Sequence, residues 1–141
     1  WSGLSVKDAR QALEMIRNNF IPETFELKTY WLTNSFCVPP KIKSSFYLLP
    51  AFDELVVSYK DRSAVIEQEY YTKAFTANGI FRPVILLNGK VIGLWKRYIQ
   101  KHKVILEAAF FRKVSKSTIN SFKIESKKYG KFLEKRVEIK E

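Results

Sequence analysis

Two apolar runs joined by two polar residues form the most regular pattern in the chain, over residues 81–87 and 90–97. The joining dipeptide, Asn88-Gly89, tolerates the positive φ angles of a type I′ turn and predicts a tight antiparallel hairpin. A two-residue loop fixes the register of such a hairpin. The predicted pairs are Leu87 with Lys90, Leu86 with Val91, Val84 with Gly93, and Arg82 with Trp95. Because both faces are mostly apolar, we expect the hairpin inside a covered sheet or a closed barrel.

Polar breaks divide the rest of the second half into further strands and helices. Short runs rich in β-formers predict strands at 46–49, 55–59, 103–111 and 136–139. Apolar positions at helical spacing predict helices near 66–77, ending at Asn78-Gly79, and near 116–129, ending at Gly130. Residues 45–141 are therefore expected to form an antiparallel β-barrel-like domain with two flanking helices.

The first part of the chain has a different order of elements. Ser5 and Asp8 have the spacing of a capping box, and the apolar positions that follow predict an amphipathic helix over 6–18. A β-rich run at 25–32 predicts a strand. Turn, helix and strand in this order are typical of a winged helix whose first helices are missing. We therefore predict a partial winged helix over residues 1–44.

Two adjacent prolines, Pro39-Pro40, mark the boundary between the two lobes because they impose a stiff, extended connection. The predicted fold class is α+β. It consists of a truncated winged-helix lobe, followed by an antiparallel β-barrel-like lobe with two flanking helices.

The composition is that of a folded protein, with 46% hydrophobic and 15% aromatic residues in 141. No apolar run approaches the length of a membrane span, and no signal-peptide pattern is present. The single cysteine, Cys37, has no partner for an internal disulfide, and one histidine with one cysteine argues against a structural zinc site. We expect a cytoplasmic protein that does not associate with membranes.

The net charge of +11 indicates the class of partner, because it favours binding to polyanions. The excess is concentrated at the C-terminal end, where residues 98–141 hold 12 Lys and Arg against 5 Asp and Glu. A lysine-rich surface that only confers solubility is the alternative explanation.

Several blocks of sequence resemble one protein family. They are Leu48-Leu-Pro-Ala-Phe-Asp-Glu54, Tyr59-Lys-Asp-Arg-Ser63, Asn78-Gly-Ile-Phe-Arg-Pro-Val84 and Gly89-Lys-Val-Ile-Gly-Leu-Trp-Lys-Arg97. In this order they are similar to the C-terminal region of the AlkZ/YcaQ-like winged-helix DNA glycosylases. Three further blocks resemble the third winged helix and the last helix of the same proteins: Trp1–Ser5 with Asp8–Arg10, Thr29–Leu32, and Lys128–Phe132.

The resemblance implies tandem winged helices followed by a β-barrel-like part, duplex DNA as the partner, and excision of alkylated or crosslinked bases by characterised members. The catalytic Gln-x-Gln motif of the family is absent here, since the glutamines are Gln11, Gln68 and Gln100. We therefore expect a C-terminal fragment that contacts the duplex backbone and partners the N-terminal domains of the same protein. We predict no catalytic residue, cofactor or metal ligand in it. Whether the fragment is an enzyme stays open, and any glycosylase activity would belong to the N-terminal part.

A polar loop predicted between a strand and a helix supplies the first candidate DNA contacts. Lys60 and Arg62 could contact phosphate there while Asp61 orients one of them. An ordinary turn with a local ion pair is the alternative. In the hairpin, Arg82 opposite Trp95 could stack on the indole and be aimed at a phosphate. The alternative is that this pair only stabilises the sheet.

A basic tip is predicted around one loop, where Lys96, Arg97, Lys101 and Lys103 lie close to His102 in the sequence. Such charge density sets non-specific affinity for nucleic acid. On the first helix, Lys7, Arg10 and Arg17 are candidates for contact with a DNA groove or backbone, and backbone contact is favoured over base reading.

Two other functions fit the same sequence. A self-contained barrel could bind single-stranded nucleic acid by stacking bases on Tyr30, Trp31 or Tyr98. Alternatively, the chain could be a structural scaffold for the N-terminal domains. A scaffold of this kind would leave an apolar patch exposed near Trp1 and the first helix.

Overall fold

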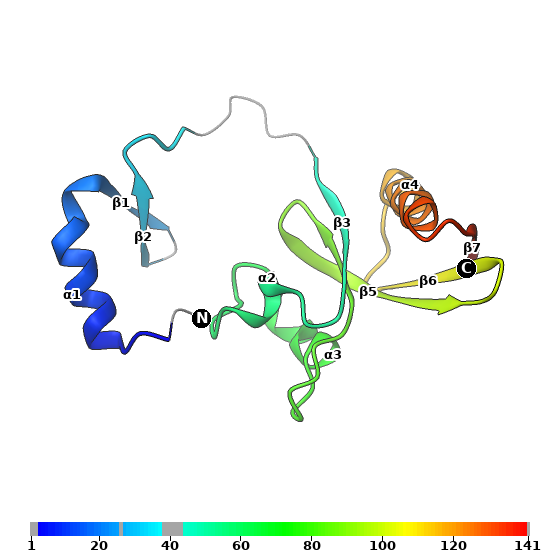
Figure 1. The fold of residues 1–141 in the computed structure, drawn as a ribbon, viewed down its shortest axis with the longest axis horizontal. Helices are drawn as coiled ribbons and strands as arrows, with labels where there is room; N and C mark the ends of the chain where they lie inside the picture. Colours follow the sequence, from blue (N-terminus) through cyan, green and yellow to red (C-terminus); the bar gives the residue numbers. More distant parts are fainter. Residues whose placement is uncertain (1–2, 26, 38–43, 141) are drawn as a thin grey trace. The chain divides into compact units, whose positions relative to one another are not determined.

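The computed structural model describes residues 3–25, 27–37 and 44–140. The chain divides into two compact units, residues 1–42 (unit 1) and 43–141 (unit 2), which are described separately (Figure 1). The proline pair expected to mark the lobe boundary lies outside the described residues.

The described part of unit 1 consists of one α-helix and one hairpin. Helix α1 (Val6–Ile16) leads through a 3₁₀ turn, η1 (Arg17–Asn19), into strands β1 (Phe20–Phe25) and β2 (Lys28–Thr33), which pair antiparallel. The capping box is confirmed, since the Ser5 hydroxyl accepts from the Asp8 amide at 3.2 Å and donates to the Asp8 carboxylate at 2.7 Å. The single strand expected at 25–32 is a hairpin instead.

Two local features explain why the sequence did not predict β1 and the turn after it. Pro22 lies inside β1 and argues against a strand in a sequence pattern, although an edge position accommodates it. In the hairpin turn, Leu27 has a φ of 62°. Positive φ is rare for leucine, so this residue does not predict a turn.

Unit 1 has almost no core of its own. No described residue of this unit is buried, and α1 buries none of its side chains. Met15 is 80% exposed. Other apolar side chains of the unit are also exposed, namely Leu4, Val6, Ile16, Ile21, Phe25, Leu27 and Phe36.

Unit 2 is built on a five-stranded sheet. Its strands are β3 (Phe46–Leu49), β4 (Val84–Leu87), β5 (Lys90–Ile99), β6 (Lys103–Phe110) and β7 (Arg136–Lys140), in the order β3-β4-β5-β6-β7. The pairs are antiparallel except β6 with β7, which is parallel because the long helix between them returns the chain to the same end of the sheet. Strands β3 and β7 are the two edges, so the expectation of a β-barrel is wrong: the described strands form an open sheet.

Both faces of the sheet are covered around the β4–β5 turn, as the apolar hairpin required. One face packs against α2 (Glu54–Val57), η2 (Gln68–Tyr70) and α3 (Tyr71–Ala74), with Val84, Leu86 and Val91 in the shared core. Helix α4 (Lys116–Phe132) covers the other face, where Phe122 joins a core that includes Ile85. Figure 1 shows the sheet between these two helical layers.

The central hairpin follows the predicted register only as far as its second pair. Leu87 faces Lys90 and Leu86 faces Val91, with Asn88 and Gly89 at positive φ. The register then shifts, so that Gly93 faces Ile85 and Leu94 faces Val84. Ile92 is therefore an extra residue, a β-bulge. The predicted pairs of Val84 with Gly93 and of Arg82 with Trp95 are wrong.

The bulge turns the side chain of Trp95 onto the α4 face. There its exposure is 3%, its Nε1 donates to the Leu49 carbonyl at 2.8 Å, and its ring meets Tyr129 edge-on. Gly93 accommodates close passage of β6 at this point, since a Cβ on it would lie 2.7 Å from the Ala109 carbonyl oxygen. A slip of one residue moves every later side chain to the opposite face.

Several predicted elements change type or length. The segment expected as a strand at 55–59 begins with helix α2, because the Asp53 carboxylate accepts from the Leu55 amide at 3.0 Å and caps it. The helix expected near 66–77 is reduced to η2 and α3. Helix α4 runs past Gly130 to Phe132, because Gly130 provides space for close packing of the return strand: a Cβ there would lie 2.9 Å from the Lys135 carbonyl oxygen.

Candidate nucleic-acid interface

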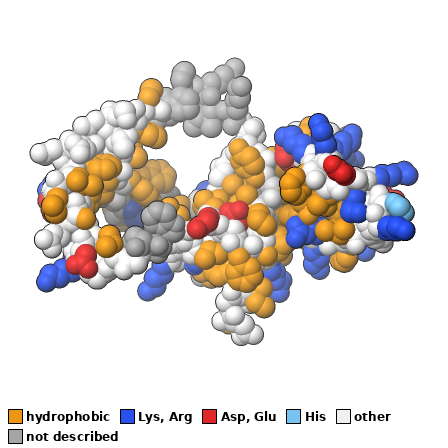
Figure 2. Space-filling view, in the orientation of Figure 1, with side chains coloured by type: hydrophobic (Ala, Val, Ile, Leu, Met, Phe, Trp, Pro, Cys, Tyr) orange, Lys and Arg blue, Asp and Glu red, His pale blue; other side chains and the backbone are white. Residues whose placement is uncertain are grey.

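The turn between β5 and β6 is a surface of positive charge built from two distant parts of the chain. Lys101 and His102 are exposed in the turn. The start of β7 lies beside them, since the Arg136 amide donates to the His102 carbonyl at 3.3 Å and the Lys135 Nζ donates to the Lys101 carbonyl at 2.7 Å. We call Lys101, His102, Lys135 and Arg136 the basic tip. Figure 2 shows Lys and Arg side chains gathered over this end of unit 2.

Sequence reasoning missed Lys135 and Arg136. They lie more than thirty residues after the turn, and only the parallel pairing of β7 with β6 brings them there. Parallel pairing needs a long crossover connection, so no short-range pattern predicts it.

The other residues expected at this tip are spread over different environments. Lys103 pairs with Glu138 at 2.7 Å, which neutralises its charge. Arg97 lies against α4, where its Nη1 donates to the Tyr129 hydroxyl at 2.7 Å and its guanidinium lies 5.8 Å from the ring centroid. Lys96, the preceding residue on β5, is exposed and points to the opposite face. The predicted cluster is therefore not one patch.

Arg62 is tied into the fold of unit 2. Its Nε and Nη2 donate to the carbonyls of Val56 and Val57 at the end of α2, and its Nη1 donates to the Tyr71 hydroxyl at 2.9 Å. The guanidinium also lies over Phe81, 5.0 Å from the ring centroid. These contacts occupy the donors that a phosphate would need and give Arg62 a structural role.

Lys60 and Arg82 are exposed side chains near Arg62 in the fold. Lys60 supplies a carbonyl to Arg62 Nη1 at 3.3 Å, and the Arg82 amide donates to the Ala74 carbonyl at 3.0 Å. Asp61 accepts from the Ser63 amide at 3.0 Å and from the Ser63 hydroxyl at 2.7 Å, as in an ordinary polar turn. Arg82 does not stack on Trp95, because the bulge buries that ring under α4.

One aromatic group of unit 2 has a shifted pKa. A hydrogen bond to Glu69 raises the pKa of the Tyr70 phenol above its usual value, with smaller contributions from burial and from the charges of Glu69 and Glu67. The phenol therefore stays neutral at physiological pH and adds no charge to this surface.

The candidates in unit 1 lie on an exposed helix. Lys7 and Arg10 are three residues apart on α1 and therefore share a face. Arg17 lies beyond them, pairs with Glu14 at 3.4 Å and lies over Trp31, 5.4 Å from its centroid.

The aromatic residues considered for base stacking are divided between the two units. Tyr30 is 42% exposed and Tyr98 is 47% exposed, but they belong to different units. Trp31 is half-buried and, as the neighbour of Tyr30 on β2, points to the opposite face of the hairpin.

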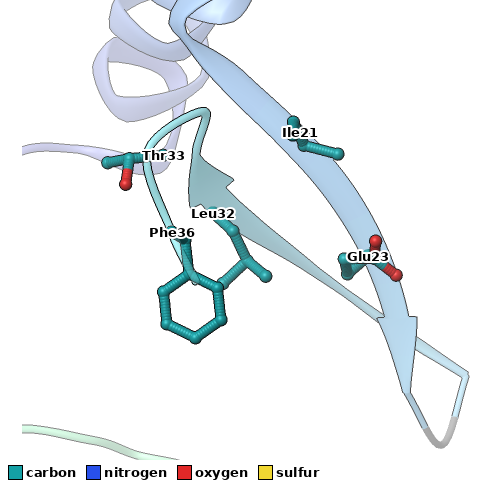
Figure 3. Close-up of a pocket in the computed structure, with 5 residues that line it drawn as sticks. All are labelled: Ile21, Glu23, Leu32, Thr33 and Phe36. Atoms are coloured by element: carbon teal, nitrogen blue, oxygen red, sulfur yellow. The ribbon is translucent and has the colours of Figure 1, made fainter. Parts of the chain in front are cut away.

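Unit 1 also has an apolar hollow on its hairpin, with a volume of about 370 Å³. Figure 3 shows Ile21 and Glu23 on β1, Leu32 and Thr33 at the end of β2, and the Phe36 ring beyond them. The hollow contains one carboxylate and no basic side chain, so it does not suit a nucleic acid.

Within the described ranges, no group of three or more His, Cys, Asp and Glu side chains is placed to hold a metal ion. No helix in the same ranges is long and apolar enough to cross a membrane.

Comparison with known proteins decides the family. The model of the family described as DNA glycosylase AlkZ-like matches residues 1–132. This chain belongs to the AlkZ-like DNA glycosylase family. The resemblance seen in the sequence blocks is thereby confirmed.

The structure is also similar to that of the Streptomyces sahachiroi DNA glycosylase AlkZ, with a TM-score of 0.72 and 15% sequence identity. The match covers 99% of this chain and 38% of that protein, so the chain spans well under half the length of this AlkZ. At this identity the likeness shows a shared fold. No curated protein matches the sequence.

Proposed function

We propose that this chain is the C-terminal, DNA-contacting part of an AlkZ-like repair protein and that it binds the backbone of duplex DNA. The observation that carries the proposal is the charge of unit 2, which holds 20 Lys and Arg against 10 Asp and Glu and exposes several of them at the basic tip. Membership of a DNA glycosylase family supports DNA as the polyanion. The three glutamines form no Gln-x-Gln pattern, which supports binding without catalysis.

In this proposal the phosphate contacts of unit 2 come from exposed cations. Lys101 lies at the basic tip, Lys96 and Arg97 lie on β5, and Lys60 and Arg82 lie near α2 and α3. Lys103 and Arg62 support the fold and do not touch phosphate, because their side-chain N–H groups bind other groups of the protein. Cations that contact phosphate bind without reading sequence.

We further propose that unit 1 is the end of a winged helix. Helix α1 followed by the β1–β2 hairpin is the order of a recognition helix and its wing, which supports this assignment. Lys7 and Arg10 would contact the DNA backbone. The neighbouring Asp8 and Glu14 dilute the positive charge of the helix, so backbone contact fits better than base reading.

Titration of a fluorescent duplex with the whole chain at increasing salt tests the proposal. The logarithm of the binding constant should fall linearly with the logarithm of salt concentration, because bound phosphates release counterions. Lys101→Gln with Arg136→Gln should weaken binding and reduce the slope by about 1.8. Lys73→Gln with Lys90→Gln, which removes two exposed lysines outside the basic tip, is the charge-matched control. Absence of binding to duplex at low salt would refute the proposal.

Unit 1 favours a second candidate, a structural scaffold in a longer protein. Its exposed apolar side chains and the hollow beside Phe36 support a role in packing against other domains. Fusing the chain to the remaining domains of an AlkZ-like protein tests this idea. Amide exchange in α1 should then slow markedly, whereas unchanged exchange would rule the scaffold role out.

A further inference from the structure

Helix α4 has two faces with opposite chemistry. Its buried residues recur every four positions, at Thr118, Phe122, Ser126 and Gly130, and they face the sheet. An adjacent, exposed side of the helix carries four lysines, which we call the lysine stripe: Lys116, Lys123, Lys127 and Lys131. At 3.6 residues per turn these four fall within an arc of about 80°.

Among the described residues, no carboxylate forms an ion pair with the lysine stripe. The ion pairs found among the described residues of unit 2 join Lys103 to Glu138, Arg112 to Glu67 and Lys128 to Glu125. The last of these lies on the flank of α4. None involves the stripe, so all four of its charges face solvent.

Stability of the helix does not explain this arrangement. Lys123 and Lys127, like Lys127 and Lys131, are four residues apart, and like charges at this spacing repel. Lys116 is the first residue of α4, where the helix dipole favours an acidic side chain and no acidic residue is present in the first turn. Glu at either place would stabilise the helix better than Lys.

The shape of this face suits a sugar–phosphate backbone. Lys116, Ile119, Asn120 and Lys123 line a hollow of about 250 Å³ on α4. Two ammonium groups and an amide around a hollow of this size can hold a phosphate and part of its sugar. From Lys116 to Lys131 the helix rises about 22 Å. A straight track of this length can meet several phosphates of a duplex, which carries one charge per ~1.7 Å of its axis.

The lysine stripe runs into the basic tip. Lys131 is in the last turn of α4, its carbonyl accepts from the Glu134 amide at 3.1 Å, and Lys135 and Arg136 follow directly. The exposed Glu134 interrupts this row, but cations on both sides of it extend the positive surface from the β5–β6 turn along the stripe side of α4. A track of this length fits a linear polyanion better than a single small anion.

We propose that the lysine stripe is a phosphate-binding track for duplex DNA that extends the contact made by the basic tip along α4. The proposal rests on the proposed function for the identity of the polyanion. It assigns four further cations that were not among the DNA-contact candidates from the sequence or in the basic tip. DNA on this track is held by its backbone, so binding is independent of base sequence.

The experiment compares charge-matched variants of the whole chain. The first is Lys123→Gln with Lys127→Gln, in the centre of the stripe. Its control is Lys73→Gln with Lys90→Gln, which removes the same charge from exposed positions of unit 2 outside the stripe and tip. A third variant, Lys123→Arg with Lys127→Arg, keeps the charge. Circular dichroism checks that each variant keeps its fold.

Binding to a fluorescent 20-base-pair duplex is measured between 50 and 200 mM salt. Each phosphate contact contributes about 0.9 to the slope of log K against log salt, so the stripe variant should lose about 1.8 and at least tenfold in affinity at low salt. The control should lose less than half as much, and the arginine variant should keep the slope of the unmodified chain.

Three outcomes would overturn the assignment. Equal losses in the stripe variant and its control would mean that only net charge matters, and the proposed function would survive. Equally tight competition by polyglutamate of the same charge would show that the track is not for duplex DNA. Failure of the unmodified chain to bind duplex at low salt would refute both the stripe and the proposed function.

Discussion

The two units differ in what they bury and in what charge they carry. The thirteen buried hydrophobic residues found among the described positions all belong to unit 2. No described residue of unit 1 is buried, and this unit carries 5 basic against 4 acidic residues, whereas unit 2 carries 20 against 10. In unit 2 the apolar side chains pack between the sheet and its helices, so the solvent-facing surface of the unit can carry charge. A lone helix and hairpin must instead expose apolar surface.

The largest difference between the units should appear when a tryptophan is removed from each. Trp95→Ala deletes a ring that is 3% exposed and leaves the Leu49 carbonyl without its donor, so it should destabilise unit 2 by about 3–5 kcal/mol. Trp31→Ala removes a half-buried ring from the mostly exposed hairpin of unit 1 and should change stability by about 1 kcal/mol or less. Urea unfolding followed by circular dichroism measures both. Similar effects of the two changes would mean that unit 1 has a core.

A second test concerns the close packing of α4 in unit 2. Gly130→Ala should destabilise by about 1–3 kcal/mol, because the new Cβ would meet the Lys135 carbonyl and Val137. Alanine in a helix is normally better than glycine by about 0.5–1 kcal/mol, so the expected sign is reversed here. Asn120→Ala, on the exposed face of the same helix, should be neutral or slightly stabilising. Thermal unfolding distinguishes the two, and a stabilising Gly130→Ala would contradict this packing.

A third test separates structural from DNA-contacting cations within unit 2. Arg62→Gln should destabilise by about 1–3 kcal/mol, because the carbonyls that end α2 lose their donors. The salt slope of DNA binding, measured on the folded variant, should not change. Lys60→Gln should do the reverse. Its free energy of unfolding should change by no more than about 0.5 kcal/mol, and its salt slope of DNA binding should fall by about 0.9. A lower slope in Arg62→Gln alone would assign the phosphate contact to Arg62.

The smallest effect should come from the cap of α1. Ser5→Ala removes the acceptor of the Asp8 amide and should cost about 1 kcal/mol of local helix stability. Because unit 1 lacks a core, the loss should be confined to α1, where amide exchange would accelerate several-fold. Exchange in β5 and β6 should be unchanged. Acceleration in those strands would show that the two units unfold together.

Features that depend on near neighbours in the chain could be predicted from the sequence. The Asn88-Gly89 turn, the Ser5 cap and the start of α4 after Ser115 each depend on residues within three or four positions. The apolar hairpin also predicted a sheet covered on both faces, since neither face suits water. The lysines of α4 follow a helical period, so their exposed face was predictable as well.

Tertiary contacts decided the remaining features. The bulge at Ile92 arises where β6 passes close to Gly93, and it moved Trp95 away from the side of Arg82. The glycine expected to end α4 lies within the helix because the return strand packs against it.

Both the local sequence and the tertiary contacts determine the candidate site. Local sequence provides its cations, but the guanidinium of Arg62 and the ammonium of Lys103 are bound by groups that only the fold places beside them. The parallel pairing of β7 with β6 joins the lysine stripe to the β5–β6 turn. Charge and period are local properties of a chain, whereas a continuous charged surface requires segments that meet only after the crossover has formed.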